Sequence, residues 1–246
     1  MTGASSGIGR ATAKRLAKDG CQILAVGRDG AALALVCQEI VTDGGVAHPF
    51  SVDVTSDNGP GQIVAKALQL FGRIDVLVNA AGIIASGAVA DTHDDLWDAM
   101  MDVNVRAPFR LIREASPAIM ATKGAIVNVS SVTGTRAFPG VAAYCVSKAA
   151  VDQLTRVAAL EMAAAGVRVN AVNPGVVVTN LHRRSGMDEA KYAAFLERAK
   201  ETHPMGRPGT PEDVADVIAF LAAPSTSWVT GMTVAVDGGR HLTCLR

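Results

Sequence analysis

Aromatic residues, cysteine and any excess of charge are scarce in this chain of 246 residues. Aromatic side chains make up 4% of it, while alanine and valine are abundant, so we expect a core of closely packed small aliphatic side chains. Lys plus Arg and Asp plus Glu number 23 each. This balance argues against a nucleic-acid or anionic-membrane surface, because both need an excess of positive charge.

The cysteines show no pattern of a metal site or a redox pair. They are scattered, with no C-x-x-C pair and no histidine at metal-ligand spacing: Cys21, Cys37, Cys145 and Cys244. We therefore expect reduced thiols in a reducing compartment and no metal. No apolar run approaches the roughly 18 residues that a membrane helix needs, and no basic and apolar leader opens the sequence. The prediction is a cytoplasmic protein without a membrane partner.

Short β-branched runs alternate with longer alanine-rich segments along the chain. The short runs are almost continuously apolar, as in strands that are covered on both faces, and they predict strands at 21–26, 46–52, 75–79, 125–130, 167–173 and 233–236. The amphipathic segments between them predict helices at 10–18, 31–42, 61–71, 94–120, 141–165 and 211–221. This alternation is typical of an α/β protein with a doubly wound, Rossmann-like parallel sheet and helices on both faces.

No repeat, low-complexity linker or break in composition divides the chain, so we predict a single domain over residues 1–246. The stretch 180–209 differs from the rest, because it is rich in arginine, glycine and proline around a short helical pattern at 188–202. Long irregular insertions in compact domains are often lids or binding loops. We therefore interpret 180–209 as a variable substrate loop.

A glycine-rich loop, Thr2-Gly3-Ala4-Ser5-Ser6-Gly7-Ile8-Gly9, leads into the first predicted helix. Its glycines let a pyrophosphate approach the backbone, and the helix N-terminus offers free N–H groups and a partial positive charge. Such a loop follows a strand, which is central in a doubly wound sheet. We expect about six to eight residues of this strand upstream of Met1, because its absence would leave core backbone groups unpaired at about 1–3 kcal/mol each.

The residues after the strand 21–26 bear on the choice of coenzyme. An acidic side chain at this place binds the 2′-hydroxyl of NAD, whereas an arginine accommodates the 2′-phosphate of NADP. Gly27 stands where the acid is expected and Arg28 follows it; a guanidinium can hold a phosphate by two charge-assisted hydrogen bonds. NADP(H) is the prediction. NAD is the alternative, because Asp29 could turn inward and Ser6 does not supply a second basic side chain.

Tyr144 and Lys148 are four residues apart in a predicted helix and share one of its faces. A free tyrosine titrates near pH 10, and a neighbouring ammonium lowers that pKa and makes the phenol usable for general acid/base catalysis. The same pair is common on protein surfaces, so its surroundings decide. Ser131, 79–82 and 173–175 all follow predicted strands, and ligands bind at the carboxyl ends of parallel strands.

Taken together, these motifs resemble those of the short-chain dehydrogenase/reductase family from Thr2 to Gly239. The resemblance rests on the T-G-x-x-x-G-I-G loop, N-A-A-G at 79–82, the Y-x-x-x-K pair and P-G-x-x-x-T at 174–179, in that order. It implies hydride transfer between a nicotinamide coenzyme and a small-molecule carbonyl or secondary alcohol. It also implies a homotetramer in which the helices 94–120 and 141–165 pair across one interface.

The resemblance implies roles for individual residues. Tyr144 is the general acid/base, and Ser131, rather than its neighbour Ser130, hydrogen-bonds the same substrate oxygen. Lys148 holds the nicotinamide ribose and lowers the pKa of Tyr144, while Asn104 holds a water that links Lys148 to solvent; the alternative for Asn104 is a helix-kink asparagine. With Tyr144 and Lys148, the expected coenzyme contacts are Gly3, Ser5, Ser6, Ile8, Arg28, Asp53, Val54, Asn79, Ala80, Gly82, Pro174, Val177 and Thr179.

The substrate stays open, because a 3-oxoacyl thioester reductase and a dehydrogenase of sugars, polyols or sterols differ mainly in the variable loop. An enoyl-thioester reductase is disfavoured, since that branch spaces its tyrosine and lysine further apart. A non-catalytic nucleotide-binding regulator is disfavoured by the complete catalytic set. His182, Arg183 and Arg184 either bind an anionic substrate or lie in a solvated loop, and Arg136 either reaches the substrate or forms a surface turn.

Overall fold

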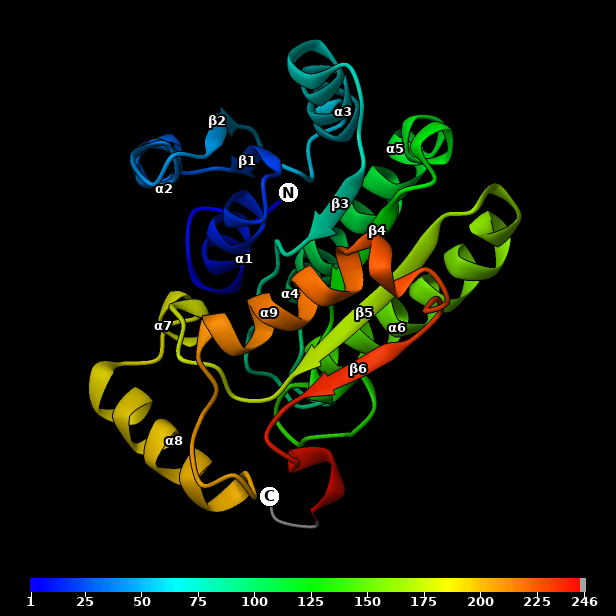
Figure 1. Cartoon of the computed structure of the whole chain (residues 1–246). Helices are drawn as coiled ribbons and strands as arrows, with labels where there is room; N and C mark the ends of the chain where they lie inside the picture. Colours follow the sequence, from blue (N-terminus) through cyan, green and yellow to red (C-terminus); the bar gives the residue numbers. More distant parts are fainter. Residues whose placement is uncertain (244–246) are drawn as a thin grey trace.

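A computed structural model describes residues 1–243, in which parallel strands alternate with helices (Figure 1). The strands are β1 (Gln22–Gly27), β2 (Val46–Ser51), β3 (Val76–Asn79), β4 (Ala125–Val129), β5 (Arg168–Pro174) and β6 (Thr233–Val236). Each predicted strand agrees with an observed one to within a residue at either end, because continuous apolar runs mark strands that are buried on both faces. The predicted α/β fold with a parallel sheet is confirmed.

The sheet consists of two runs that meet at the start of the chain. One run is β1 with β2, and the other is β3-β4-β5-β6 in that order. Between them, the Thr2 N–H donates to Val78 O over 3.0 Å, and the Val26 N–H donates to Met1 O over 2.9 Å. Met1 and Thr2 therefore lie where the central first strand is expected. Beside them, a cavity of about 390 Å³ separates β1 from β3 and is lined partly by α3 and α5.

Helices cover both faces of the sheet (Figure 1). Alternate residues of β1 enter different clusters, since Ile23 and Ala25 pack with α1, α2 and α9, whereas Leu24 and Val26 pack with α3, α5 and α6. The helices are α1 (Gly7–Lys18), α2 (Gly30–Thr42), α3 (Gly59–Phe71), α4 (Asp94–Met101), α5 (Ala107–Thr122), α6 (Ala142–Met162), α7 (Leu181–Arg184), α8 (Glu189–Thr202) and α9 (Pro211–Ala222).

Three helix predictions are wrong in their bounds; one of them, 141–165, ends as an α-helix at Met162 and continues as a 3-10 turn to Ala165. The predicted helix 94–120 is interrupted by a π-helical turn, Asp102–Arg106, between α4 and α5. Pro108 has no N–H to donate to the Asn104 carbonyl, so the regular i to i−4 pattern cannot continue there. The first helix begins at Gly7 instead of residue 10, because Ser6 is its extended N-cap. The helix N-terminus therefore lies inside the glycine loop.

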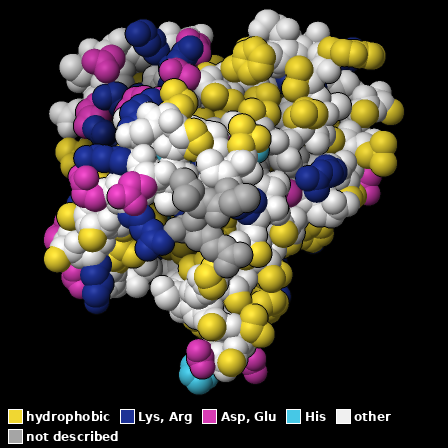
Figure 2. Space-filling view, turned by 90° about the horizontal axis from the view of Figure 1, so that it is seen from below, with side chains coloured by type: hydrophobic (Ala, Val, Ile, Leu, Met, Phe, Trp, Pro, Cys, Tyr) yellow, Lys and Arg dark blue, Asp and Glu magenta, His cyan; other side chains and the backbone are white. Residues whose placement is uncertain are grey.

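The segment 180–209 holds α7 and α8 and extends beyond the carboxyl ends of the strands (Figure 1). Tyr192 of α8 is 2% exposed. Its hydroxyl donates to Thr179 O over 2.9 Å and accepts from the Thr179 N–H over 3.2 Å, which fixes the segment to the loop after β5; residues 180–209 are called the lid below, and their predicted role as a substrate loop stays a prediction. Seen from below, charged side chains gather over the side that carries the lid, and hydrophobic ones gather over the opposite side (Figure 2).

Cys21, Cys37 and Cys145 are free thiols, and burial raises the pKa of Cys21 and of Cys37. Cys244, the fourth predicted thiol, lies outside the described residues. Over residues 1–243, no helix combines the length and the apolar character needed to cross a membrane.

Candidate active site

A cavity of about 290 Å³ lies at the carboxyl ends of β3, β4 and β5. Part of its wall is the glycine loop with the start of α1, and another part comes from the loops that follow β3, β4 and β5. Tyr144 and Lys148 of α6 line it, and α7, α8 and Arg240 complete the wall. The cavity therefore joins the glycine loop to the residues expected for proton transfer.

The glycine loop packs against the loop after β3 so closely that side chains are excluded. A Cβ at Gly3, whose φ is +67°, would lie 2.6 Å from Ala80 O, and one at Gly9 would lie 2.1 Å from Gly3 O. The first N–H groups of α1 have no acceptor within the helix, and the Ser6 side chain does not cap them. This set of free donors at a positive helix end fits the pyrophosphate of a dinucleotide.

Tyr144, Ser131 and Lys148 form one buried group, with 7%, 7% and 4% of their surfaces exposed. The Tyr144 and Ser131 hydroxyls are hydrogen-bonded to each other. The Lys148 Nζ lies 5.6 Å from the centroid of the Tyr144 ring and donates to Val129 O over 2.9 Å. Ser130 instead donates its hydroxyl to the Lys148 carbonyl over 3.1 Å, so that Ser131 and not Ser130 contacts the phenol.

Burial governs the titration of both α6 groups. It raises the pKa of Tyr144 to about 12, against a smaller lowering effect of the Ser131 hydrogen bond. It also lowers the pKa of Lys148 to about 8, against the raising effect of Asp152. Burial of the phenolate thus dominates the pKa of Tyr144 in this structure, and the predicted lowering of that pKa by Lys148 stays a prediction. The phenol holds its proton at neutral pH.

A polar cluster under the site was only partly predicted, because the sequence pointed to 173–175 but not to Asp152. The Asn173 side-chain amide donates to Ser131 O and to the Asp152 carboxylate, each over 2.9 Å, and so ties the loop after β4 to α6. Asp152 is 1% exposed, and burial raises its pKa. Its position four residues after Lys148, on the face of α6 that already carries Tyr144, was the available signal.

Asn104 lies behind the site in the π-helical turn and does not line the cavity. Its side chain accepts from the Ile83 N–H over 2.9 Å and donates to Ile83 O and to the Ser147 hydroxyl, each over 3.0 Å. A Cβ at Gly82 would lie 3.3 Å from the Asn104 Oδ1 and 3.6 Å from the Lys148 Nζ. Asn104 thus holds the loop after β3 beside Lys148; its predicted water contact stays a prediction.

Most of the predicted coenzyme contacts line the cavity, together with Tyr144 and Lys148: Gly3, Ser5, Ser6, Ile8, Ala80, Gly82, Pro174, Val177 and Thr179. Four do not. The Asn79 side-chain amide donates to the Asn128 side-chain oxygen over 2.9 Å, and Val54 is a core residue with 7% of its surface exposed. The Asp53 carboxylate accepts from the Thr55 N–H and hydroxyl over 2.9 and 2.7 Å, which lowers its pKa. Arg28 is exposed at the end of β1.

The surroundings of Arg28 bear on the choice between NADP and NAD. The Asp29 carboxylate accepts from the Ala32 N–H over 3.0 Å at the start of α2, so it faces its own helix instead of the glycine loop. A Cβ at Gly27 would lie 3.6 Å from the Ser5 Oγ. Position 27 therefore borders the glycine loop without presenting an acid to it.

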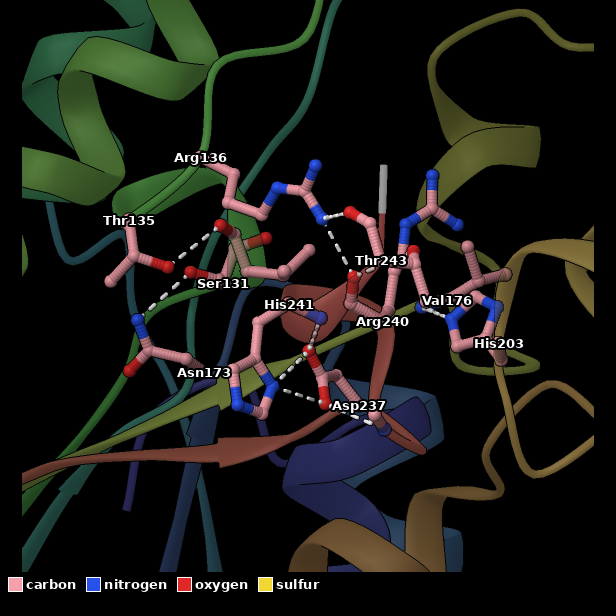
Figure 3. Close-up of polar contacts among 12 residues, drawn as sticks. Ser131, Thr135, Arg136, Asn173, Val176, His203, Asp237, Arg240, His241 and Thr243 are labelled. Carbon is pink, nitrogen blue, oxygen red and sulfur yellow. Dashed lines mark hydrogen bonds and ion pairs between the residues drawn. The ribbon is translucent and has the colours of Figure 1, made fainter. Parts of the chain in front are cut away.

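The loop before α6, the lid and the C-terminal segment add wall residues that no motif indicated: Phe138, Phe195 and Arg240. His182 and Arg184 also line the cavity, whereas Arg183 forms an ion pair with Glu189 at 2.6 Å outside it. Arg136 does not line the cavity, because its guanidinium donates to the carbonyls of Arg240 and Thr243 (Figure 3). These residues come from separate segments of the chain, so the local sequence could not predict that they lie close together in the fold.

Known proteins match this chain over nearly its whole length. The family model described as enoyl-(acyl carrier protein) reductase matches residues 3–241. The 3-oxoacyl-[acyl-carrier-protein] reductase FabG of Thermotoga maritima is 37% identical over 97% of this chain and 95% of its own. A Caenorhabditis elegans short-chain dehydrogenase/reductase of unknown function, crystallised with cofactor, superposes with a TM-score of 0.93 at 35% identity, covering 98% and 94% of the two chains.

A second solved structure carries a nucleotide. This Beutenbergia cavernae protein, assigned as an NAD(P)-dependent gluconate 5-dehydrogenase, superposes with a TM-score of 0.89 at 38% identity. The match covers 98% of this chain and 95% of that one, and the structure holds NADP at low occupancy.

Proposed function

The chain belongs to the short-chain dehydrogenase/reductase family of NAD(P)-dependent oxidoreductases, and we propose that it reduces a carbonyl group with NADPH, using Tyr144 as general acid. One observation carries the proposal. The Tyr144 phenol is buried in the cavity that begins at the glycine loop, with its hydroxyl bonded to Ser131 and the Lys148 ammonium beside it. The reverse reaction is oxidation of the corresponding alcohol.

The residues of this chain supply the binding and the proton step. The α1 N-terminus takes the pyrophosphate, and Lys148, which already donates to Val129 O, holds the nicotinamide ribose with its remaining donors. The bound nicotinamide supplies or accepts the hydride. Tyr144 donates its proton to the substrate oxygen. The Ser131 Oγ accepts from the Thr133 N–H over 3.2 Å, which orients the hydroxyl, and a bound substrate oxygen would take the Ser131 hydrogen in place of the Tyr144 oxygen.

The direction of catalysis follows from the proton that Tyr144 carries. A phenol with its pKa raised to about 12 is protonated at neutral pH, which suits a general acid in carbonyl reduction. Oxidation needs the phenolate and is therefore favoured by rising pH. The protonated phenol therefore suits the proton step of the proposed reduction at neutral pH.

The choice of NADP over NAD is supported by Arg28. It is exposed at the end of β1, the Asp29 carboxylate is engaged with α2, and Gly27 presents no acid. The guanidinium is thus available for the 2′-phosphate, which is a doubly hydrogen-bonded partner for arginine. The related gluconate 5-dehydrogenase structure holds NADP.

The experiment that tests the proposal compares the two tyrosines of the chain. Tyr144→Phe removes the proton donor, so turnover should fall by at least about 10²–10⁴-fold, the usual contribution of general acid catalysis. NADPH binding, followed by fluorescence, should stay within about twofold, because the α1 donors remain. The matched comparison is Tyr192→Phe, which removes a buried hydroxyl that holds the lid but does not line the cavity, so turnover should fall far less than in Tyr144→Phe. Equal activity of Tyr144→Phe and the wild type would refute the proposal.

We also propose a homotetramer built through α5 and α6. On α6, Leu160 is 82% exposed, Val146 45% and Val157 43%, and on α5 Phe109 is 47% exposed. Large apolar side chains gathered on two neighbouring helices are typical of subunit contacts.

The substrate proposal stays at the level of carbonyl chemistry. The four-residue spacing of Tyr144 and Lys148 favours reduction of C=O over reduction of an enoyl C=C, because the enoyl branch of the family spaces this pair further apart. The Thermotoga relative is named for a 3-oxoacyl substrate, and the Beutenbergia protein for gluconate. Both substrate classes pair a carbonyl or hydroxyl with an acyl or acid group.

A further inference from the structure

The cavity wall is unusual in its charge. The chain as a whole has equal numbers of basic and acidic residues. Among the described residues that line the cavity, however, none is Asp or Glu, whereas Lys148, Arg184 and Arg240 are cationic. Lys148 belongs to the coenzyme in the proposed function. Two arginines therefore remain on the wall without an acidic neighbour in the lining.

Arg240 is held in place by its surroundings, but not all of its hydrogen-bond donors have acceptors. Its backbone carbonyl accepts from Arg136 over 2.7 Å, and its N–H donates to Asp237 O over 3.0 Å (Figure 3). The guanidinium lies with its Cζ 5.1 Å from the centroid of the Phe138 ring, and one of its Nη atoms donates to the Thr202 hydroxyl over 3.0 Å. Its Nε is buried and has no hydrogen-bond partner.

The nearby carboxylate does not neutralise this guanidinium. Asp237 is 2% exposed in its side chain and accepts from the Gly239 N–H over 3.0 Å, from the His241 N–H over 2.7 Å and from the His241 ring over 3.0 Å (Figure 3). Within residues 1–243, no ion pair of Arg240 occurs. Arg240 lines the cavity, and its one side-chain hydrogen bond among the described residues is to Thr202, so its remaining Nη donors are available to a ligand that accepts hydrogen bonds.

The lid adds a second cation. Arg184 lies on α7, and its side chain donates no hydrogen bond within the described part of the chain. Its neighbour Arg183 is engaged by Glu189 and lies over the Tyr192 ring at 4.0 Å, so it is not available. The lining also includes the apolar side chains of Phe138, Val141 and Phe195, beside polar residues such as Asn180 and His182. The wall thus combines a hydrophobic surface with two arginines.

We propose that the substrate is an oxo acid, whose carboxylate is bound by Arg240 and by Arg184 of the lid while its carbonyl lies at Tyr144. This assignment rests on the proposed function for the position of the carbonyl. A carboxylate matches the planar donor edge of a guanidinium, and the apolar wall accommodates the methylene groups between the two functional groups. Arg240 is thereby a specificity-determining residue.

The first test measures binding without turnover. Hexanoate and its uncharged counterpart hexanamide are titrated into the enzyme–NADPH complex by calorimetry. Hexanoate should bind at least about tenfold more tightly, and Arg240→Gln should weaken hexanoate by about 10–150-fold, the range for a hydrogen bond to a charged group. Arg184→Gln should weaken it similarly while its NADPH affinity stays within about twofold of the wild type. The matched control is Lys191→Gln, which removes an exposed lid cation that is paired with Asp188 outside the cavity.

The second test measures specificity. Initial rates with NADPH are compared for 4-oxopentanoate, 5-oxohexanoate and 6-oxoheptanoate, each against its methyl ester. The wild type should prefer at least one acid over its ester by about tenfold or more in kcat/KM, and Arg240→Gln should abolish that preference through KM while rates with the esters stay within about twofold.

The outcomes separate this proposal from the proposed function. Equal binding of hexanoate and hexanamide by the wild type would overturn the carboxylate site, even if the esters are reduced. Equal losses for acids and esters in Arg240→Gln would overturn the role of Arg240. Tighter binding of hexanoate that depends on Arg240, without reduction of any oxo compound, would support the anion site and contradict the proposed reaction. Weaker NADPH binding by Arg184→Gln, with hexanoate unaffected, would overturn the role of Arg184.

Discussion

Replacing Arg28 with aspartate should reverse the coenzyme preference. The side chain is exposed at the end of β1, and the position before it is Gly27, which presents no side chain to the ribose. The Asp29 carboxylate is engaged by the Ala32 N–H and cannot take over either role without uncapping α2. A single substitution at position 28 therefore changes the only charge expected to face the 2′-phosphate.

The magnitude follows from two contributions. Loss of a hydrogen bond between charged partners costs about 1.5–3 kcal/mol, which corresponds to about 10–150-fold in affinity. The new carboxylate adds repulsion of about 1 kcal/mol or more toward a phosphate about 4 Å away. We expect kcat/KM with NADPH to fall by about 10²–10³-fold and kcat/KM with NADH to rise, because a carboxylate accepts from the 2′-hydroxyl.

The assay is the rate of loss of absorbance of the reduced coenzyme, with NADPH and NADH at several concentrations and one carbonyl substrate. The matched variant Arg28→Gln removes the charge without adding repulsion, so it should lose NADPH efficiency without a comparable gain for NADH. Raising the salt concentration should reduce the difference between wild type and Arg28→Asp, since exposed charges are screened. Undiminished use of NADPH by Arg28→Asp would refute the role given to Arg28.

Three further predictions concern the site and the assembly. Burial lowers the pKa of Lys148 to about 8 and raises that of Tyr144 to about 12, so kcat/KM for NADPH in reduction should be level below pH 8 and decline above it as the ammonium is lost. The variant Lys148→Arg should remove that decline. If the pH profile of the variant equals that of the wild type, Lys148 is not the group that titrates. Asn104→Ala leaves the Ile83 backbone groups unpaired, so calorimetry should show a Tm lower by about 4–10 °C, and an unaltered Tm would contradict this. Leu160→Asp should dissociate the proposed tetramer in sedimentation velocity, whereas an unchanged mass would exclude α6 from the interface.

The strands could be predicted because their physical cause is local. A strand that is covered on both faces must be apolar at every position. In β1, for example, Ile23 packs against the helices on one face of the sheet and Leu24 against those on the other. The glycine loop and the Tyr144/Lys148 pair are also visible locally, because both lie within a few residues of sequence. The break at Asp102–Arg106 was equally local, and Pro108 was its overlooked signal.

Other features depend on segments that meet only in the folded chain. The pKa of Tyr144 is raised mainly by burial among loops that come from different parts of the sequence, and the local Tyr144/Lys148 pattern carries no signal for that burial. Arg240 reaches the cavity from the segment after β6, where it contacts Phe138 and Thr202, and no motif contains it. Asn173 and Asp152 are brought together by β5 and α6 in the same way.

The position at which hydride arrives in the product tests the central claim most directly. NADPH deuterated at nicotinamide C4 is incubated with the enzyme and an oxo compound, and the product is analysed by mass spectrometry and NMR. The account predicts deuterium on the carbinol carbon with the wild type and a loss of at least about 10²-fold in its rate of transfer with Tyr144→Phe. Transfer to a carbon of a C=C bond, or equal transfer by Tyr144→Phe, would contradict it.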